Sequence, residues 1–300
     1  MLLKPDCIPC ILKMSTSAIR KLTDDEEVLK ELTIKTLQIP ALRGLDWGLT
    51  SPEVIEQVME KIIETFQNPD PFKLIKAEQN KKGLELYPHL QQLIQESTDP
   101  LFTAVQLAIQ GNFIDLMVSD RSTDVEKALG QELQHPIDEK AFLSFRDKLK
   151  KARLLVYLGD NSGEIVFDRI LIETIQSFVD LEVIFVVRSF PSLNDVTLKE
   201  AEQVGMDQVA RVISNGLEAP VPGTILYRCS SEFRELFRNS DLIISKGGGN
   251  FDTLEAEKNH SKDITFLLLS KCLPYCRYFQ TQMYKPILAN FFQEDYEGLD

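Results

Sequence analysis

Apolar residues recur every three to four positions through the first half of the chain, a spacing that predicts amphipathic helices. In the segment 23–39, Thr23 precedes a run of acidic residues, as an N-cap does, and leucine and isoleucine follow at helical spacing. The segment 51–66 opens with Ser51, a proline and a glutamate, which is a strong helix-start signature. Three further segments continue the pattern, at 73–97, 99–118 and 138–152. No convincing strand precedes Leu154, so we expect an α-helical domain over residues 1–150.

The spacing changes after Leu154, where short apolar runs begin to alternate with helix-like segments. The runs are LLVYL (154–158), EVIFVV (182–187), VARVIS (209–214), DLIIS (241–245) and ITFLLL (264–269). Near-continuous apolar strands that alternate with helices indicate a mainly parallel sheet covered on both faces. We therefore predict an α/β domain over residues 151–300.

Composition narrows the class of partner. The 300 residues include 33 basic and 46 acidic side chains, a formal net charge of −13, which argues against binding to nucleic acid or to an anionic membrane. A bound metal and one lysine can still make a local site attractive to a small anion. The apolar run at 264–269 is far shorter than the roughly 20 residues of a membrane helix, and the amino-terminal segment is a poor signal peptide. We expect a cytoplasmic protein.

Three of the apolar runs are each followed by a polar loop. The loops are GDNSGE at 159–164, RSFPSLND at 188–195 and SKGGGN at 245–250. The carboxyl ends of parallel strands lie along one edge of a sheet, where such sheets bind ligands. We therefore expect these loops to meet and to bring together Asp160, Asn161, Asn194, Asp195, Lys246 and Asn250.

Carboxylate and amide oxygens beside a lysine suit a divalent cation and a phosphate group. Mg²⁺ takes few protein carboxylates and keeps several waters, so two aspartates and an asparagine would be a typical protein share. Backbone N–H groups at Ser162 and Gly163, where the next helix starts, would face an anion. Lys246 would supply a mobile positive charge, and Arg188 would pair either with phosphate or with an acidic neighbour.

Each loop also has a plainer interpretation. Asp160, Ser162 and Asp195 could each cap the helix that follows. The lysine of SKGGGN precedes its glycines, unlike that of a P-loop. No GxGxxG sequence follows the first strand, so a dinucleotide fingerprint is absent. Taken together, the three loops favour a metal and phosphate site.

Two further features lie outside these loops. Four cysteines form two pairs with the spacing of a helical turn, Cys7 with Cys10 and Cys272 with Cys276. They could bind a structural Zn²⁺ or have a redox role, but free cysteine is also common in protein interiors. QGNFID places Asn112 and Asp115 one turn apart, where they could reach a substrate in a cleft between domains, or where Asn112 could simply end a helix.

The motifs as a set resemble the metal-dependent damage-control phosphatase family, once catalogued only as domain of unknown function 89. The resemblance is carried by GDNSGE, by R-x-x-P-x-x-ND at 188–195 and by KG-x-GN at 246–250. It extends over most of the chain through an early CxxC, a D-P-[FY]-x-x-x-K segment at 70–76, GN-x-ID at 111–115 and VISNG at 212–216. The early CxxC is similar to that of the mainly prokaryotic branch.

The resemblance implies a Rossmann-like three-layer α/β/α domain and a divalent metal such as Mg²⁺, Mn²⁺, Co²⁺ or Ni²⁺. It implies hydrolysis of phosphate monoesters of small metabolites, sugar phosphates or damaged phosphometabolites. The metal ligands would be Asp160, Asn161 and Asp195, with Lys246 on the phosphate and Asn194 and Asn250 nearby. Asp160, Asp195 and Lys246 would then be catalytic, with either water or an aspartate as the attacking group. The chain departs from the family pattern at Asp252, where glutamate is frequent, so substrate contacts are expected to differ.

Two other functions fit parts of the pattern. A cofactor-dependent transferase on a Rossmann-like sheet would bind NAD or S-adenosylmethionine tightly, although the missing glycine fingerprint weighs against it. A non-catalytic phosphometabolite or metal-binding regulator would keep its ligand affinity yet release no phosphate.

Overall fold

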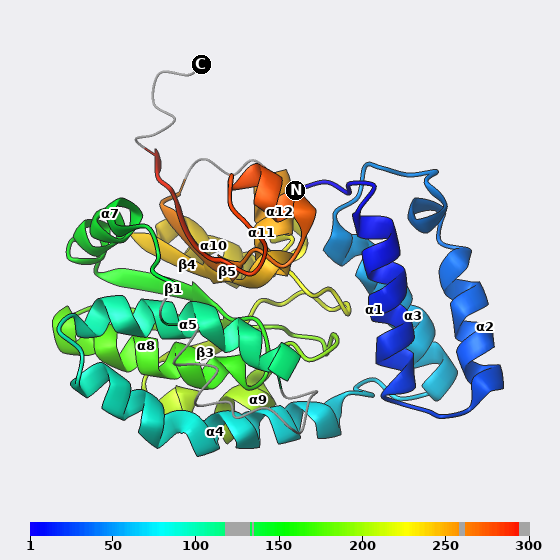
Figure 1. Cartoon of the computed structure of the whole chain (residues 1–300), viewed down its shortest axis with the longest axis horizontal. Helices are drawn as coiled ribbons and strands as arrows, with labels where there is room; N and C mark the ends of the chain where they lie inside the picture. Colours follow the sequence, from blue (N-terminus) through cyan, green and yellow to red (C-terminus); the bar gives the residue numbers. More distant parts are fainter. Residues whose placement is uncertain (118–132, 134, 258–261, 294–300) are drawn as a thin grey trace.

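The centre of the protein is a six-stranded sheet in the order β3-β2-β1-β4-β5-β6, parallel except for the antiparallel edge strand β6. The computed structural model describes residues 1–117, 133, 135–257 and 262–293, without the side chains of 112–117. Figure 1 shows the sheet between helices, with the amino-terminal helices to one side. The strands are β1 Leu154–Leu158, β2 Glu182–Val187, β3 Arg211–Ser214, β4 Leu242–Lys246, β5 Ile264–Leu269 and β6 Pro286–Phe291. The predicted α/β fold with a mainly parallel sheet is confirmed.

Alternation along the strands explains why the sheet is buried on both faces. Leu155 and Tyr157 of β1 lie in one apolar core, whereas Val156 and Leu158 lie in the core on the opposite face. Successive side chains of a strand point to opposite faces, so a continuous apolar run is what a doubly covered sheet requires. β1 pairs with β2 and with β4, with Leu155 opposite Val183 on one side and Leu242 on the other.

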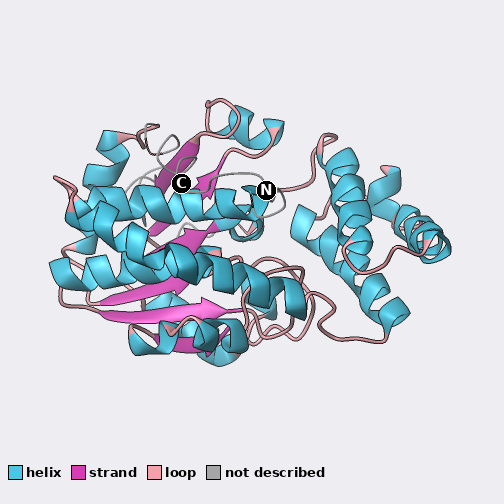
Figure 2. Cartoon of the chain, turned by 60° about the horizontal axis from the view of Figure 1, so that its bottom comes forward, coloured by secondary structure: helices cyan, strands magenta, loops and turns pink. Residues whose placement is uncertain are grey.

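Helices form a layer on each face of the sheet (Figure 2). The first face is covered by α4 Lys73–Gln95, α5 Pro100–Met117, α7 Glu139–Leu149, α8 Glu164–Phe178 and α9 Leu198–Gln203. The second face is covered by α10 Ser231–Asn239, α11 Gly247–Ala256 and α12 Leu273–Tyr278. Short 3-10 helices occupy Pro40–Arg43, Met206–Gln208 and Leu226–Arg228. This is the expected three-layer α/β/α arrangement.

The amino-terminal helices form a core of their own. They are α1 Cys7–Arg20, α2 Glu26–Leu37 and α3 Ser51–Phe66, and their apolar faces make a cluster that runs from Leu3 to Phe72. Thr50, not Ser51, caps α3, through a reciprocal pair of contacts with Glu53. The helices between residues 73 and 149 instead share the core of the sheet. Helical periodicity alone does not tell which core a helix covers.

The carboxyl ends of β1, β2 and β4 point toward this helical unit, which lies beyond their loops in Figure 1. Strand order reverses between β1 and β4, because β2 and β3 lie on one side of β1 while β4 and β5 lie on the other. Ligands of open α/β sheets bind in the crevice at such a reversal. No helix among the described residues is long and apolar enough to cross a membrane.

Candidate active site

The loops that follow β1 and β2 are joined along their backbones. Asn161 and Asp195 form an isolated antiparallel bridge. The Val196 N–H donates to Asp160 O at 2.9 Å, and the Ser162 N–H donates to Asn194 O at 2.8 Å. Residues more than 30 positions apart in sequence therefore form one short ribbon. This ribbon fixes the Asp160 and Asp195 carboxylates on one side of the crevice.

The third loop fits against the first through a glycine. Gly247 has φ +75°, and a Cβ atom placed on it would lie 1.8 Å from Asp160 Oδ2. Only glycine combines that backbone conformation with so close an approach. Glycine at position 247 of the SKGGGN loop therefore lets this backbone lie directly against the Asp160 carboxylate. The convergence of the three loops predicted from the sequence is present in the structure.

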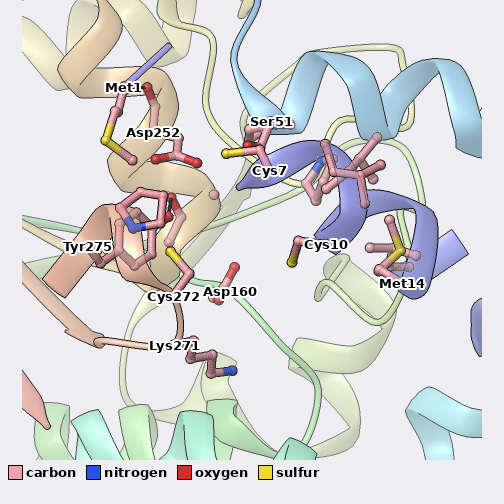
Figure 3. A pocket seen from close by; sticks show the side chains of 18 of the residues that line it. Met1, Cys7, Cys10, Met14, Ser51, Asp160, Asp252, Lys271, Cys272 and Tyr275 are labelled. Atoms are coloured by element: carbon pink, nitrogen blue, oxygen red, sulfur yellow. Dashed lines mark hydrogen bonds between the residues drawn. The ribbon is translucent and has the colours of Figure 1, made fainter. Parts of the chain in front are cut away.

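A cavity of about 340 Å³ lies where these loops face the helical unit (Figure 3). Its lining includes Asp160, Asn161, Asn194 and Asp195, together with Gly248 and Gly249 at the start of α11. Residues of α1 form the opposite wall, where Figure 3 shows Cys7, Cys10 and Met14. The structure therefore places four of the predicted polar site residues on one cavity.

The negative charges of Asp160 and Asp195 are not fully compensated by the positive charges near them, and the pKa values of both groups are raised. Burial raises the pKa of Asp160 well above its usual value, and the charges of Asp195 and Glu164 raise it further. Burial likewise raises the pKa of Asp195, while Arg188 lowers it. A cation that bound between them would relieve the repulsion, because an opposite charge favours the ionised form of a carboxyl group.

Arg188 contacts the acidic neighbour and not the cavity. Its Nε donates to Asp195 Oδ2 at 2.7 Å, and its Nη1 donates to Asn250 Oδ1 at 2.9 Å and to Thr224 Oγ1 at 3.2 Å. Its Nη2 lies 3.6 Å from Asp160 Oδ1. Of the two partners expected for Arg188, the structure shows the carboxylate, so Arg188 orients the aspartates from behind.

Lys246 does not line the cavity. Its side chain is 0% exposed, and its Nζ contacts Glu164 Oε1 at 2.6 Å, Asp168 Oδ1 at 2.5 Å and Ala108 O at 2.8 Å. These contacts raise the pKa of Lys246 against the effect of its burial. The expectation that Lys246 binds phosphate is therefore not supported by its position. As the last residue of β4, its side chain extends toward α8 and α5, where two buried carboxylates attract it.

Asn250, Ser162 and Gly163 also lie behind the cavity. The Asn250 amide is fully used, since it accepts from Arg188 and from Thr224 and donates to the Gly159 and Lys246 carbonyls. The Gly163 N–H donates to Asn80 Oδ1 at 2.8 Å, and the Ser162 N–H bonds Asn194. The helix start that reaches the cavity is that of α11, at Gly248 and Gly249, and not that of α8.

Lys271 is a cavity residue that the sequence reasoning missed. It follows β5, the neighbour of β4, and it lines the cavity. Its positive charge lowers the pKa of Asp160, so the two side chains interact. The signal that could have found it is the strand-end rule, because the run at 264–269 was recognised as a strand and a lysine follows its end.

The side chains around the two aspartates fit a hard divalent cation. Asp160, Asp195 and Asn161 offer carboxylate and amide oxygens, the donors that such ions prefer. The Asn161 amide lies against Asp160 Oδ2 at 2.8 Å and Glu164 Oε2 at 3.2 Å. Within the described residues, no group of three or more histidine, cysteine, aspartate or glutamate side chains is placed to hold a metal, so a cation here would also need the amide and water.

All four paired cysteines belong to the described residues, and among those residues no group of three or more is placed to hold a zinc ion. Cys7, Cys10 and Cys272 instead line the cavity, and burial raises the pKa of Cys272 to about 12. Asn112 and Asp115, the other residues expected near the site, belong to α5, and their side chains lie outside the described part of the chain.

Fold and site together define a Rossmann-like α/β protein with an acidic ligand site at the strand-order reversal. By comparison with known proteins, the chain belongs to the family described as Damage-control phosphatase ARMT1-like domain, which matches residues 3–286. The family resemblance read from the motifs is confirmed.

Relatives match the chain over nearly its whole length. The chain is 32% identical to an uncharacterized protein of Methanocaldococcus jannaschii, with 91% of this chain and 90% of that protein covered. It is 31% identical to a damage-control phosphatase of Pyrococcus horikoshii, with 89% and 90% covered. A solved structure of a domain of unknown function 89 family protein from P. horikoshii is similar with a TM-score of 0.85 and 26% identity, covering 97% of this chain and 99% of that one.

Proposed function

We propose that the protein is a metal-dependent phosphatase that hydrolyses phosphate monoesters of small, damaged metabolites. The observation that carries the proposal is the pair of buried carboxylates, Asp160 and Asp195, beside Lys271 and the amino terminus of α11 in one cavity. Relatives named damage-control phosphatases, from P. horikoshii and from Archaeoglobus fulgidus at 28% identity, support the class of reaction.

The two sides of the cavity would act on different parts of the reaction. Asp160, Asn161 and Asp195 would hold a divalent cation such as Mg²⁺, Mn²⁺, Co²⁺ or Ni²⁺, which when bound would supply charge neutralisation and acidify water. The Lys271 ammonium and the backbone N–H groups of Gly248 and Gly249 would bind phosphoryl oxygens, since a helix amino terminus favours anions. Donors fixed in this way stabilise the charge that develops on those oxygens during phosphoryl transfer.

Arg188 would keep this arrangement in place. Its guanidinium group donates hydrogen bonds to Asp195 and Asn250. The Asn250 amide in turn donates to the carbonyl of Gly159, the residue before Asp160. Both aspartates are thereby held in one orientation before any ligand binds, and a preorganised site avoids the cost of reorganisation during the reaction.

Phosphate release from a panel of phosphate monoesters, measured with each divalent metal in turn, tests the proposal. Asp160→Ala and Asp195→Ala should each lose most of the activity, while Asp207→Ala, which removes an exposed carboxylate in a remote 3-10 helix, should not. Unchanged release in both site variants would refute the assignment. Absence of release from every ester, with metal affinity retained, would favour the regulator instead.

A second measurement tests metal binding separately from catalysis. A cation that binds only the folded protein raises the melting temperature as its concentration rises. The wild-type protein should therefore be stabilised by Mn²⁺, and Asp195→Ala should show a much smaller shift. Equal shifts in the two proteins would place the metal elsewhere.

Lys271 has its own test. Lys271→Ala should lower kcat/KM by about 10- to 100-fold, because a hydrogen bond to a charged group contributes about 1.5–3 kcal/mol. Lys140→Ala, which removes an exposed lysine on α7, is the matched control. Equal activity of the two variants would show that Lys271 does not contact the phosphate.

A further inference from the structure

The cavity continues past the start of α11 to a buried carboxyl group, Asp252. Asp252 lies four residues after Gly248 on the same helix, so the two share a face and are about 6 Å apart along the axis. Both line the cavity. A ligand bound at the helix start would therefore point along this face toward Asp252, which Figure 3 labels among the residues that line the cavity.

Asp252 has an unused acceptor. The residue is 5% exposed, and its Oδ1 atom is buried without a hydrogen-bond partner among the residues that the structure describes. The amino-terminal ammonium contacts Asp252 O and Glu255 Oε2, and its charge lowers the pKa of Asp252. The Tyr275 hydroxyl donates to Gly248 O at 2.9 Å and also lowers the pKa of Asp252 as a side-chain hydrogen-bond partner, so the carboxyl oxygen without a partner among the described residues is Oδ1 alone. Burial raises the pKa of Asp252 to about 7. A buried polar atom without a partner is costly, so a ligand that supplied a donor here would gain from it.

The wall between Asp252 and the helical unit is apolar and rich in sulfur. Its polar residues are Asp6 and Ser51, and most of it is formed by Met1, Cys10, Ile11, Met14, Pro52 and Ile55. Such side chains offer no strong donors or acceptors for a chain of hydroxyl groups, whereas methionine adapts well to apolar and aromatic groups. The wall therefore suits a compact hydrocarbon or ring and not a polyhydroxylated sugar.

We propose that Asp252 ends a subsite for the alcohol part of the substrate, and that this part is a compact apolar group with a hydrogen-bond donor, hydroxyl or ammonium, at the end far from the phosphate. The inference rests on the proposed phosphatase function and adds the class of ester to it. The phosphate would lie at Lys271 and the start of α11, the apolar spacer against the sulfur-rich wall, and the donor at Asp252 Oδ1. A spacer of about four carbon atoms suits the roughly 6 Å that four residues of helix rise.

Two phosphate esters of the same length test this subsite. Hydroxybutyl phosphate, with the hydroxyl on the carbon farthest from the phosphate, differs from pentyl phosphate only in a terminal hydroxyl in place of a methyl group. The wild-type protein should favour the hydroxyl ester in kcat/KM by about 10- to 100-fold, the range expected for one hydrogen bond to a charged group. Asp252→Ala should bring the ratio close to one, and the isosteric Asp252→Asn should keep part of it. Asp207→Asn, a remote change of the same charge, should leave the ratio as in wild type.

The outcomes separate this inference from the function on which it rests. Equal kcat/KM for the two esters in the wild-type protein, or a ratio that persists in Asp252→Ala, overturns the subsite. Release of phosphate from p-nitrophenyl phosphate but from neither ester of the pair also overturns it, and the phosphatase function stands. Release from no ester at all overturns both. Because the two esters are compared in the wild-type protein, the inference can be refuted even if Asp252→Ala does not fold.

Discussion

Gly247→Ala is the change that tests most directly how the loops position Asp160. The added Cβ would lie 1.8 Å from Asp160 Oδ2, whereas real Cβ contacts essentially never fall below 3.0 Å. The carboxylate would therefore have to move by at least 3.0 − 1.8 = 1.2 Å. A misplacement of about 1 Å at a reacting centre can cost about 100-fold in rate. We expect kcat/KM of Gly247→Ala to fall by about that factor.

Gly44→Ala is a matched control for the backbone. Gly44 has φ +72°, close to the +75° of Gly247, but the nearest atom to its added Cβ is Trp47 Cζ2 at an ordinary 3.5 Å. Both variants pay the left-handed backbone penalty, about 1–2 kcal/mol, and only Gly247→Ala displaces the carboxylate. Urea denaturation of both proteins should show comparable losses of stability from the backbone, while phosphate release should fall only in Gly247→Ala.

Two results would refute this reasoning. Activity of Gly247→Ala within a few-fold of the wild-type protein would mean that Asp160 is not held against Gly247 in the working enzyme. An equal loss of activity in both variants would mean that backbone strain, and not displacement of the carboxylate, is responsible.

Three further predictions concern Lys246, Asp252 and the paired cysteines. Lys246→Met should lower the free energy of unfolding by about 3–5 kcal/mol, because it leaves Glu164 and Asp168 buried without their cation; a urea midpoint equal to that of Lys140→Met would contradict it. The pKa of Asp252 is about 7 in the folded protein, against an ordinary value of 3.8. Its buried carboxyl group is therefore protonated below pH 4 and stabilises the folded state there. The free energy of unfolding should fall by up to about 4 kcal/mol as the pH rises to 7. Asp252→Asn should not show this pH-dependent loss of stability. If the free energy of unfolding of the variant and of the wild-type protein changed in parallel with pH, the prediction would be wrong. Purified protein should contain no zinc by elemental analysis, and one zinc per chain that Cys10→Ser removes would reinstate the cysteine site.

The local signals in the sequence were sufficient for the fold class and for half of the site. Apolar runs that alternate with helical segments specify a covered parallel sheet, and that topology alone brings Asp160, Asn161, Asn194 and Asp195 to one edge. The same logic failed for Lys246, because a lysine at a strand end can extend either into the crevice or back beneath it. Its direction depends on Glu164 and Asp168 on α8, a contact that spacing does not specify.

The order of the elements and the sheet edge at which the candidate site lies can both be predicted from the sequence, since they depend on periodicities of two and 3.6 residues along the chain. Three further outcomes depend on tertiary packing: helices 73–149 cover the sheet, Lys271 and not Lys246 lines the cavity, and Asp252 lines it with one oxygen, Oδ1, that has no hydrogen-bond partner among the described residues. These outcomes depend on packing between segments up to about 250 residues apart. Long-range packing and charge pairing select among conformations that are locally equivalent, and no short window of sequence contains both partners.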